Sequence, residues 1–118
     1  MIYGIGVDLT EIARIQHAQD KNPHFAAKLL TEAEMAAYSK LSDKRAAEFL
    51  AGRFSVKEAY AKAYGTGLGA VALHAVECLN DKAGKPVLTK HPYPGQAFVS
   101  ISHTDTLVMT EVILEVAP

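Results

Sequence analysis

The chain of 118 residues contains a single cysteine, Cys78, so no disulfide bond can form within it. Sparse cysteine use is typical of proteins from a reducing compartment. The sequence also lacks a basic segment followed by an apolar run at its start, and no apolar run approaches the ~20 residues that span a bilayer. These absences argue against a secreted or membrane-spanning protein, and we expect a soluble, cytoplasmic one.

An excess of charge of one sign is also missing. The formal net charge is −1, so the average electrostatics favour neither nucleic acid nor an anionic membrane as a partner. Apolar residues make up 49% of the chain and charged residues 21%, which is an ordinary globular balance, and we expect one domain over residues 1–118. A chain of this length leaves little material for a deep cleft, and an active site shared between subunits would relieve that limit.

One long helix dominates the predicted structure. The stretch DKRAAEFLAGRFSVKEAYAKAY is rich in Ala, Glu and Lys and predicts a helix over 43–64, with Asp43 as N-cap and Gly65 as terminator. Two shorter helices are predicted at 11–18, capped by Thr10, and at about 32–41, after a capping box of Thr31 and Glu34.

Strands are expected before and after this long helix in the sequence. The first is a short buried strand over 2–8, and the others are predicted at 71–79, from Pro86 onward, at 97–102 and at 106–116. The last two are separated by only HTD, which indicates a hairpin. A long helix packed on an antiparallel sheet gives an α+β fold.

The first strand carries an acidic residue at its end. In GIGVDLTEI, the apolar side chains of Ile5 and Val7 are expected to be buried and so to hold Asp8 in place. We expect Gly4 and Gly6 to let the long helix pack close to the strand.

The long helix carries a polar stripe formed by Ser55, Glu58 and Lys62. Glu58 and Lys62 have the spacing of a surface ion pair, which contributes only about 0.3–0.5 kcal/mol. Arg53 and Lys57 are different, because they project into the apolar arc, where an unpaired cation is costly. Either their charges reach the edge of the helix, or an anionic group, a ligand or a subunit interface meets them.

Two further stretches carry polar or glycine-rich character. GTGLG follows the helix and would let a backbone approach a ligand closely, although turn glycines explain it equally well. In SISHTD, the side chains of Ser102, His103 and Thr104 sit where a strand runs into a tight turn. Backbone N–H groups, hydroxyls and an imidazole suit a phosphate, and a self-contained hairpin turn is the alternative.

Three stretches in this order, GIGVDLTEIARI, GRFSVKEAYAKAYGTG and SISHT, resemble the holo-acyl-carrier-protein synthases, the small group of 4′-phosphopantetheinyl transferases. The family pattern falls on Asp8, on Phe54, Lys57, Glu58, Ala59, Lys62 and Ala63, and on Ser102 with His103. The resemblance implies the 4′-phosphopantetheinyl transferase fold. It also implies Mg²⁺-dependent transfer of the phosphopantetheine arm of coenzyme A to a serine of apo-acyl carrier protein, in support of fatty acid biosynthesis. Adenosine 3′,5′-bisphosphate would be released, and the active sites would lie between the subunits of a homotrimer.

The resemblance also implies roles for single residues. Asp8 and Glu58 would bind Mg²⁺, and Lys62 would contact the same phosphates and assist the leaving group. Glu58 or a metal-bound water would serve as general base. The implied contacts with coenzyme A are Arg53, Lys62, Gly65, Thr66, Pro86, His103 and Thr104.

The acidic carrier protein would dock on the first helix. Arg14 matches the basic character that the family has there, and Lys21 and Phe25 would add a charge and an apolar contact. The chain departs from the family at Ala18, Lys21, Asn22 and His24, where relatives often carry more arginine. Electrostatic steering of the carrier is therefore expected to be weaker or differently tuned.

Three other functions are compatible with these residues. A metal-dependent phosphohydrolase using Asp8 and Glu58 would release product with no carrier protein present. A non-catalytic coenzyme A or nucleotide binding module would not need Glu58 and Lys62 on one stripe. In a structural oligomer, Arg53 and Lys57 would be interface residues only.

Overall fold

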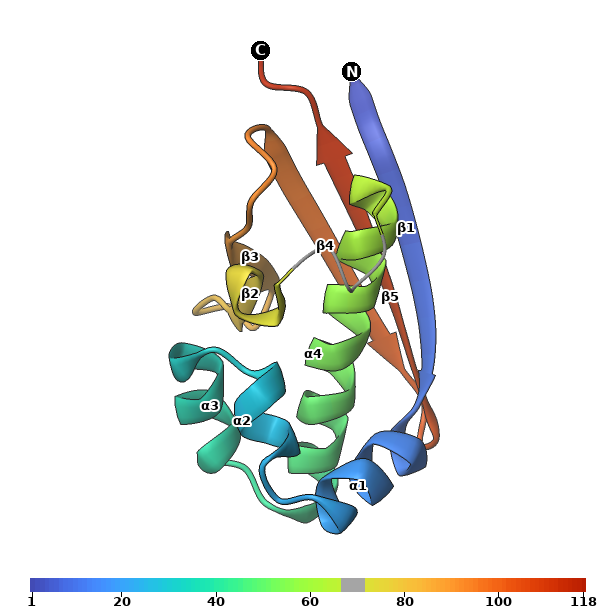
Figure 1. Cartoon of the computed structure of the whole chain (residues 1–118), viewed down its shortest axis with the longest axis vertical. Coiled ribbons are helices and arrows are strands. Elements are labelled where there is room, and N and C mark those ends of the chain that lie inside the picture. Colours follow the sequence, from blue (N-terminus) through green and yellow to red (C-terminus); the bar gives the residue numbers. More distant parts are fainter. Residues whose placement is uncertain (67–71) are drawn as a thin grey trace.

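The structure of the chain is a computed structural model that describes residues 1–66 and 72–118. A long helix lies across a three-stranded sheet, and shorter helices and a small hairpin flank it (Figure 1). The elements are β1 (Ile2–Glu11), α1 (Ile12–Lys21), α2 (Phe25–Leu29), α3 (Glu32–Ser39), α4 (Asp43–Tyr64), the 3₁₀ helix η1 (Leu73–Ala75), β2 (Glu77–Asn80), β3 (Pro86–Lys90), β4 (Gln96–His103) and β5 (Leu107–Glu115).

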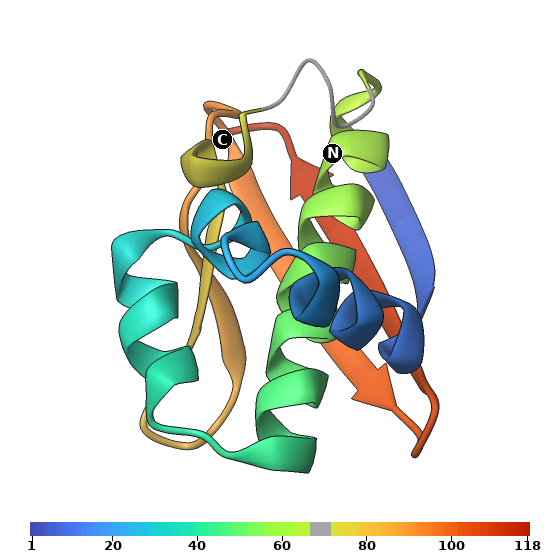
Figure 2. The same ribbon diagram turned by 60° about the horizontal axis from the view of Figure 1, so that its bottom comes forward.

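The predicted α+β class is confirmed, but the strands form two sheets. The larger sheet is antiparallel with the order β1-β5-β4, and α4 packs along one of its faces. The smaller sheet is the β2–β3 hairpin, which lies beside β4 (Figures 1 and 2). The β4–β5 hairpin confirms the expected turn at HTD.

Two glycines set the close contact between β1 and α4. A Cβ atom on Gly4 would lie 1.9 Å from the carbonyl oxygen of Ala63, and one on Gly6 would lie 1.9 Å from that of Ala59. No side chain fits at such distances, so the prediction that these glycines admit the helix is confirmed.

The expected burial of Ile5 and Val7 is wrong. Alternate residues of a strand face opposite sides of the sheet, and Gly6 and Thr10 occupy the side covered by α4. Ile5 and Val7 point to the other side and are 54% and 45% exposed. Asp8 shares the helix-facing side, so its surroundings come from α4 rather than from its apolar neighbours in sequence.

Lys57 finds its anionic partner within the chain. Its Nζ donates to Glu34 Oε1 at 2.8 Å and to the carbonyl oxygens of Leu29 and Leu73 at 2.7 and 2.9 Å. Glu34 Oε2 accepts the backbone N–H of Cys78 at 2.8 Å, and both charged side chains are fully buried. Burial lowers the pKa of Lys57, and the Glu34 carboxylate opposes that shift. The pair joins α4 to α2, α3, η1 and β2.

The first helix begins later than predicted. Thr10 belongs to β1, which continues to Glu11, and Glu11 takes the N-cap position of α1 without a side-chain cap. Ser42, not Asp43, is at the N-cap position of α4, whereas Gly65 ends α4 in the left-handed conformation as predicted.

The capping box of Thr31 and Glu34 is confirmed at the start of α3. The short helix α2 was not predicted. The strand expected over 71–79 begins later than predicted. The 3₁₀ helix η1 occupies Leu73–Ala75, and β2 runs over Glu77–Asn80. Residue 71 and the last three residues of GTGLG lie outside the described residues. Within the part of the chain that the structure describes, no helix has the length and apolar character needed to cross a membrane.

Candidate active site

The carboxylate of Asp8 lies at the contact between β1 and α4, and two hydroxyl groups orient it. Thr10 Oγ1 donates to Asp8 Oδ2 at 2.5 Å, and Ser55 Oγ donates to the same oxygen at 2.8 Å. Ser55 also shares a hydrogen bond of 2.8 Å with Thr110 on β5. The Asp8 side chain is 11% exposed. Oδ2 is therefore fixed by two hydrogen bonds, and Oδ1 is the oxygen nearer to Lys62.

Lys62 lies next to this second oxygen, and Glu58 lies one turn before Lys62 on the polar stripe of α4. Lys62 Nζ donates to the carbonyl oxygen of Val7 at 3.0 Å and lies 3.4 Å from Asp8 Oδ1. The ion pair of Lys62 is thus with Asp8 rather than with Glu58. Glu58 is half-buried, and its carboxylate makes no hydrogen bond or ion pair with the residues that the structure describes.

The donor set at this site is small and made of oxygen atoms. No group of three or more His, Cys, Asp or Glu side chains gathers for a metal ion among residues 1–66 and 72–118. Mg²⁺ commonly takes one or two protein carboxylates and completes its shell with water and substrate phosphates. Asp8 and Glu58 fit that ion, and they do not fit an ion that needs a full protein cage.

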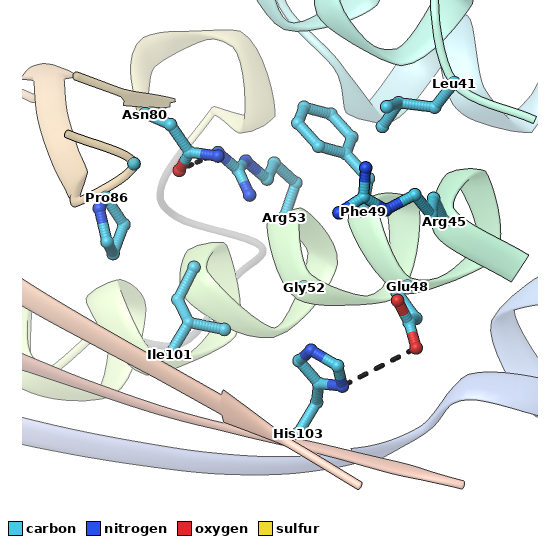
Figure 3. A pocket seen from close by; sticks show the side chains of 11 residues that line it. Leu41, Arg45, Glu48, Phe49, Gly52, Arg53, Asn80, Pro86, Ile101 and His103 are labelled. Atoms are coloured by element: carbon cyan, nitrogen blue, oxygen red, sulfur yellow. Dashed lines mark hydrogen bonds and ion pairs between the residues drawn. The ribbon is translucent and has the colours of Figure 1, made fainter. Parts of the chain in front are cut away.

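A separate pocket of about 370 Å³ opens between α4, the β2–β3 hairpin and β4 (Figure 3). It brings together three of the predicted coenzyme A contacts, Arg53, Pro86 and His103. The remaining lining residues are Leu41, Arg45, Glu48, Phe49, Gly52, Asn80, Gly84 and Ile101.

Arg53 forms one wall of this pocket and is held in place by its neighbours. Its Nε donates to the carbonyl oxygen of Cys78 at 3.0 Å, and a terminal nitrogen donates to Asn80 Oδ1 at 3.1 Å. The guanidinium carbon lies 4.1 Å from the centre of the Phe49 ring. Burial lowers the pKa of Arg53, although a guanidinium keeps its charge in proteins.

His103 and Thr104 have different surroundings. His103 lines the pocket, with Nδ1 3.6 Å from Glu48 Oε2 (Figure 3). The Thr104 hydroxyl instead accepts the backbone N–H groups of Thr106 and Leu107, at 3.2 and 3.0 Å. That hydroxyl completes the hairpin turn, as the alternative interpretation of SISHTD expected.

Arg53 of the pocket and Glu58 of the polar stripe project from different sides of α4. At ~100° per residue, Arg53 and Glu58 differ by roughly 140° around the helix axis. Gly65 and Thr66 lie at the C-terminal end of α4, outside the pocket. Arg53 therefore does not project from the side of α4 that carries Glu58.

The predicted docking residues lie along α1 and the start of α2. Arg14 and Lys21 are exposed on α1, and Phe25 is half-buried at the first position of α2. The Arg14 guanidinium carbon lies 5.7 Å from the centre of the Phe54 ring on α4.

Comparison with known proteins identifies the family. The model of the 4′-phosphopantetheinyl transferase superfamily matches residues 4–117. The chain belongs to this superfamily. It is 67% identical over 115 residues to the holo-[acyl-carrier-protein] synthase of Lacticaseibacillus casei (strain BL23), covering 98% of this chain and 93% of the relative. It is 56% identical over 115 residues to that of Latilactobacillus sakei subsp. sakei (strain 23K), covering 98% of both chains.

Solved structures agree with this assignment. A holo-(acyl-carrier-protein) synthase from Bacillus anthracis, in complex with CoA (3′,5′-ADP), has a TM-score of 0.92 and 41% identity, with 99% of each chain covered. The synthase from Neisseria meningitidis has a TM-score of 0.88 and 32% identity, covering 98% of this chain and 99% of that one. The resemblance based on the three motifs is confirmed, together with the fold and the enzyme class, a phosphopantetheinyl transferase.

Sequence reasoning missed several residues that shape these sites. Thr10 meets Asp8 because the two residues lie on one side of β1, which the sequence did not predict to extend this far. Thr110 meets Ser55 through the packing of α4 on β5, which no local pattern reveals. Arg45 precedes Arg53 by eight residues, a spacing that keeps both on one side of a helix and could have identified it. Asn80 had no such signal, since its place depends on how the β2–β3 hairpin packs.

Proposed function

We propose that this protein transfers the 4′-phosphopantetheine arm of coenzyme A to a serine of apo-acyl carrier protein, in a Mg²⁺-dependent reaction that releases adenosine 3′,5′-bisphosphate. The observation that carries the proposal is the arrangement of Asp8, Glu58 and Lys62, which we call the Asp8 group. A carboxylate fixed through one oxygen, a second carboxylate without a partner among the described residues and a lysine meet where β1 contacts α4.

Asp8 Oδ1 and the Glu58 carboxylate would hold Mg²⁺ at this contact. When bound, the ion would neutralise the diphosphate of coenzyme A and stabilise charge on the departing phosphate. Lys62, already 3.4 Å from Asp8 Oδ1, would donate hydrogen bonds to the same phosphates. Glu58 is the better general base for the acceptor serine, because two hydroxyl donors already engage Asp8.

The pocket would bind the phosphorylated nucleoside end of coenzyme A. Arg53 and His103 offer donors to a phosphate, and Pro86 offers an apolar surface. The complex of the Bacillus anthracis relative with CoA (3′,5′-ADP) supports this choice of ligand. Gly65 and Thr66, and the backbone at Thr104, would add contacts outside the pocket.

The different directions of Arg53 and Glu58 on α4 support a site shared between subunits. The face of the β1-β5-β4 sheet that α4 does not cover carries exposed apolar side chains, including Ile5, Leu9, Phe98 and Met109. Exposed apolar surface of this kind favours association. We propose a homotrimer in which one subunit contributes the Asp8 group and its neighbour contributes the pocket.

The carrier protein would dock on α1, near the Asp8 group. Arg14 and Lys21 would face its acidic surface, and Phe25 would supply an apolar contact. The reaction would support fatty acid biosynthesis in the cytoplasm, and the 118 residues would act as one catalytic domain.

The reaction is tested by measuring, with chromatography, the release of adenosine 3′,5′-bisphosphate from coenzyme A. We expect release only when both Mg²⁺ and apo-acyl carrier protein are present, and none from the Asp8→Ala or Glu58→Ala variants. Release without carrier would instead indicate a phosphohydrolase. Binding of coenzyme A without release under any condition would indicate a binding module.

Mixed oligomers test the shared site. Glu58→Ala and His103→Ala are each expected to lower activity, because each removes one half of the site. Subunits of the two variants, dissociated and reassembled together, should regain activity, since some interfaces then combine an intact Asp8 group with an intact pocket. Activity no higher than that of the separate variants would contradict the sharing of sites.

A further inference from the structure

Gly52 occupies the middle of α4, where helix propensity favours alanine over glycine. Packing within the chain does not require a glycine here. A Cβ atom on Gly52 would meet nothing within 4 Å among the described residues outside its own stretch of helix, whereas Cβ atoms on Gly4 and Gly6 would collide with carbonyl oxygens. Its backbone also avoids the left-handed region that Gly65 and Gly84 adopt. Neither steric nor conformational need of the free protein explains the residue.

The space above Gly52 is the pocket itself. Gly52 lines it between Arg53 and Glu48, and Figure 3 shows His103 and Ile101 projecting toward the same stretch of α4 from β4. A side chain at this position would therefore enter the volume that these residues surround. Because Gly52 has no side chain, the backbone of α4 borders the pocket directly at this position.

We propose that Gly52 serves ligand binding, because it lets the phosphorylated nucleoside of coenzyme A lie directly against the backbone of α4. The inference rests on the proposed function, because it takes that ligand as the occupant of the pocket. Arg53 and His103 would engage phosphate on either side, and the nucleoside would cover Gly52. The close approach of the ligand to α4 would then explain why a glycine is present, although glycine lowers the stability of the helix in the free protein.

Calorimetric binding of adenosine 3′,5′-bisphosphate and of coenzyme A to Gly52→Ala and Gly52→Leu tests this role. The bisphosphate serves as probe because its binding does not depend on turnover. We expect Gly52→Ala to melt at or above the temperature of the unchanged protein, since alanine favours the helix. Its Kd for both ligands should nevertheless rise about tenfold, and that of Gly52→Leu further, because the added atoms overfill the pocket.

Ala36→Leu is the matched control, because it adds bulk at an exposed position of α3 outside the pocket and should leave both Kd values unchanged. Size-exclusion chromatography should give one oligomeric state for all variants. Unchanged affinity in both Gly52 variants would overturn the inference while leaving the proposed function intact. A melting temperature of Gly52→Ala below that of the unchanged protein would overturn it too, by indicating a packing role. Failure of the unchanged protein to bind either ligand would overturn the proposed function and the inference with it.

Discussion

Asp8 illustrates how neighbouring side chains orient a single carboxylate, here in the proposed metal site. Thr10 and Ser55 both donate to Oδ2, so the side chain cannot rotate without losing two hydrogen bonds. The remaining oxygen, Oδ1, lies 3.4 Å from Lys62 Nζ. Fixing one oxygen reduces the reorganisation needed when a cation and a substrate bind, which is where preorganised sites gain most.

Ser55→Ala tests this orientation at the scale of one residue. We expect kcat to fall about tenfold, because the Asp8 carboxylate loses one of the two donors that position it. Stability should fall by about 1 kcal/mol as Thr110 loses its partner. Ser39→Ala, which removes an exposed hydroxyl at the end of α3, is the control and should leave kcat unchanged. An unaltered kcat in Ser55→Ala would show that Ser55 does not position Asp8.

At the scale of elements, the contact between α4 and β1 places every residue of the Asp8 group. Gly6→Ala should disturb it severely, because the new methyl group would lie 1.9 Å from the backbone oxygen of Ala59, which cannot rotate away. We expect a loss of at least about 3 kcal/mol in the free energy of unfolding, at the upper end of overpacking costs. Urea denaturation measures it, and a loss below about 1 kcal/mol would contradict the close contact.

The buried pair of Lys57 and Glu34 joins α4 to the elements around it. Lys57→Met would leave the Glu34 carboxylate buried without its cation and should cost about 3–5 kcal/mol of stability. The double variant Lys57→Met with Glu34→Gln should regain part of that loss, because no unpaired charge remains and the Gln amide oxygen can still accept a backbone N–H that Glu34 accepts. Thermal unfolding of both variants provides the measurement. Equal destabilisation of the single and double variants would contradict the charge-based explanation.

These elements also show where sequence reasoning succeeds. The helix over 43–64 and the capping box at Thr31 depend on local patterns, and both are confirmed. Gly4 and Gly6 suggested a close contact, which the structure also has. The roles predicted for Asp8, Glu58 and Lys62 came from the family resemblance, and only the helical stripe that carries Glu58 and Lys62 can be read from spacing. The strand expected to end at Asp8 continues to Glu11.

The features that sequence reasoning missed depend on tertiary packing. Ile5 and Val7 were expected inside, because an apolar run does not reveal that only one face of its strand is covered. Thr10 was predicted to cap a helix, but it belongs to β1 and pairs with Val108 on β5. Lys57 gave no sign that its partner lies on α3, a separation of 23 residues in sequence. Such contacts form only in the folded chain, so no short stretch of sequence predicts them.

At the scale of the whole molecule, the uncovered face of the larger sheet predicts association. Leu9 is 63% exposed in the single chain, so Leu9→Glu should be tolerated by the fold itself. In the oligomer it would bury an unpaired carboxylate, and we expect dissociation with loss of most of the activity. Light scattering coupled to size-exclusion chromatography measures the mass.

Ala33→Glu, at an exposed position of α3, is the control for added charge and should retain both mass and activity. A Leu9→Glu protein of unchanged mass and activity would indicate that subunits do not meet through this face of the sheet.

The most direct test of the account is the intact mass of an apo-acyl carrier protein after incubation with this protein, coenzyme A and Mg²⁺. We predict a gain of about 340 Da on the carrier, the mass of one phosphopantetheine arm, and no gain when EDTA removes the metal. The Glu58→Ala variant should behave like the EDTA control. An unchanged carrier mass with several different carriers, despite measurable binding of coenzyme A, would contradict the proposed transfer.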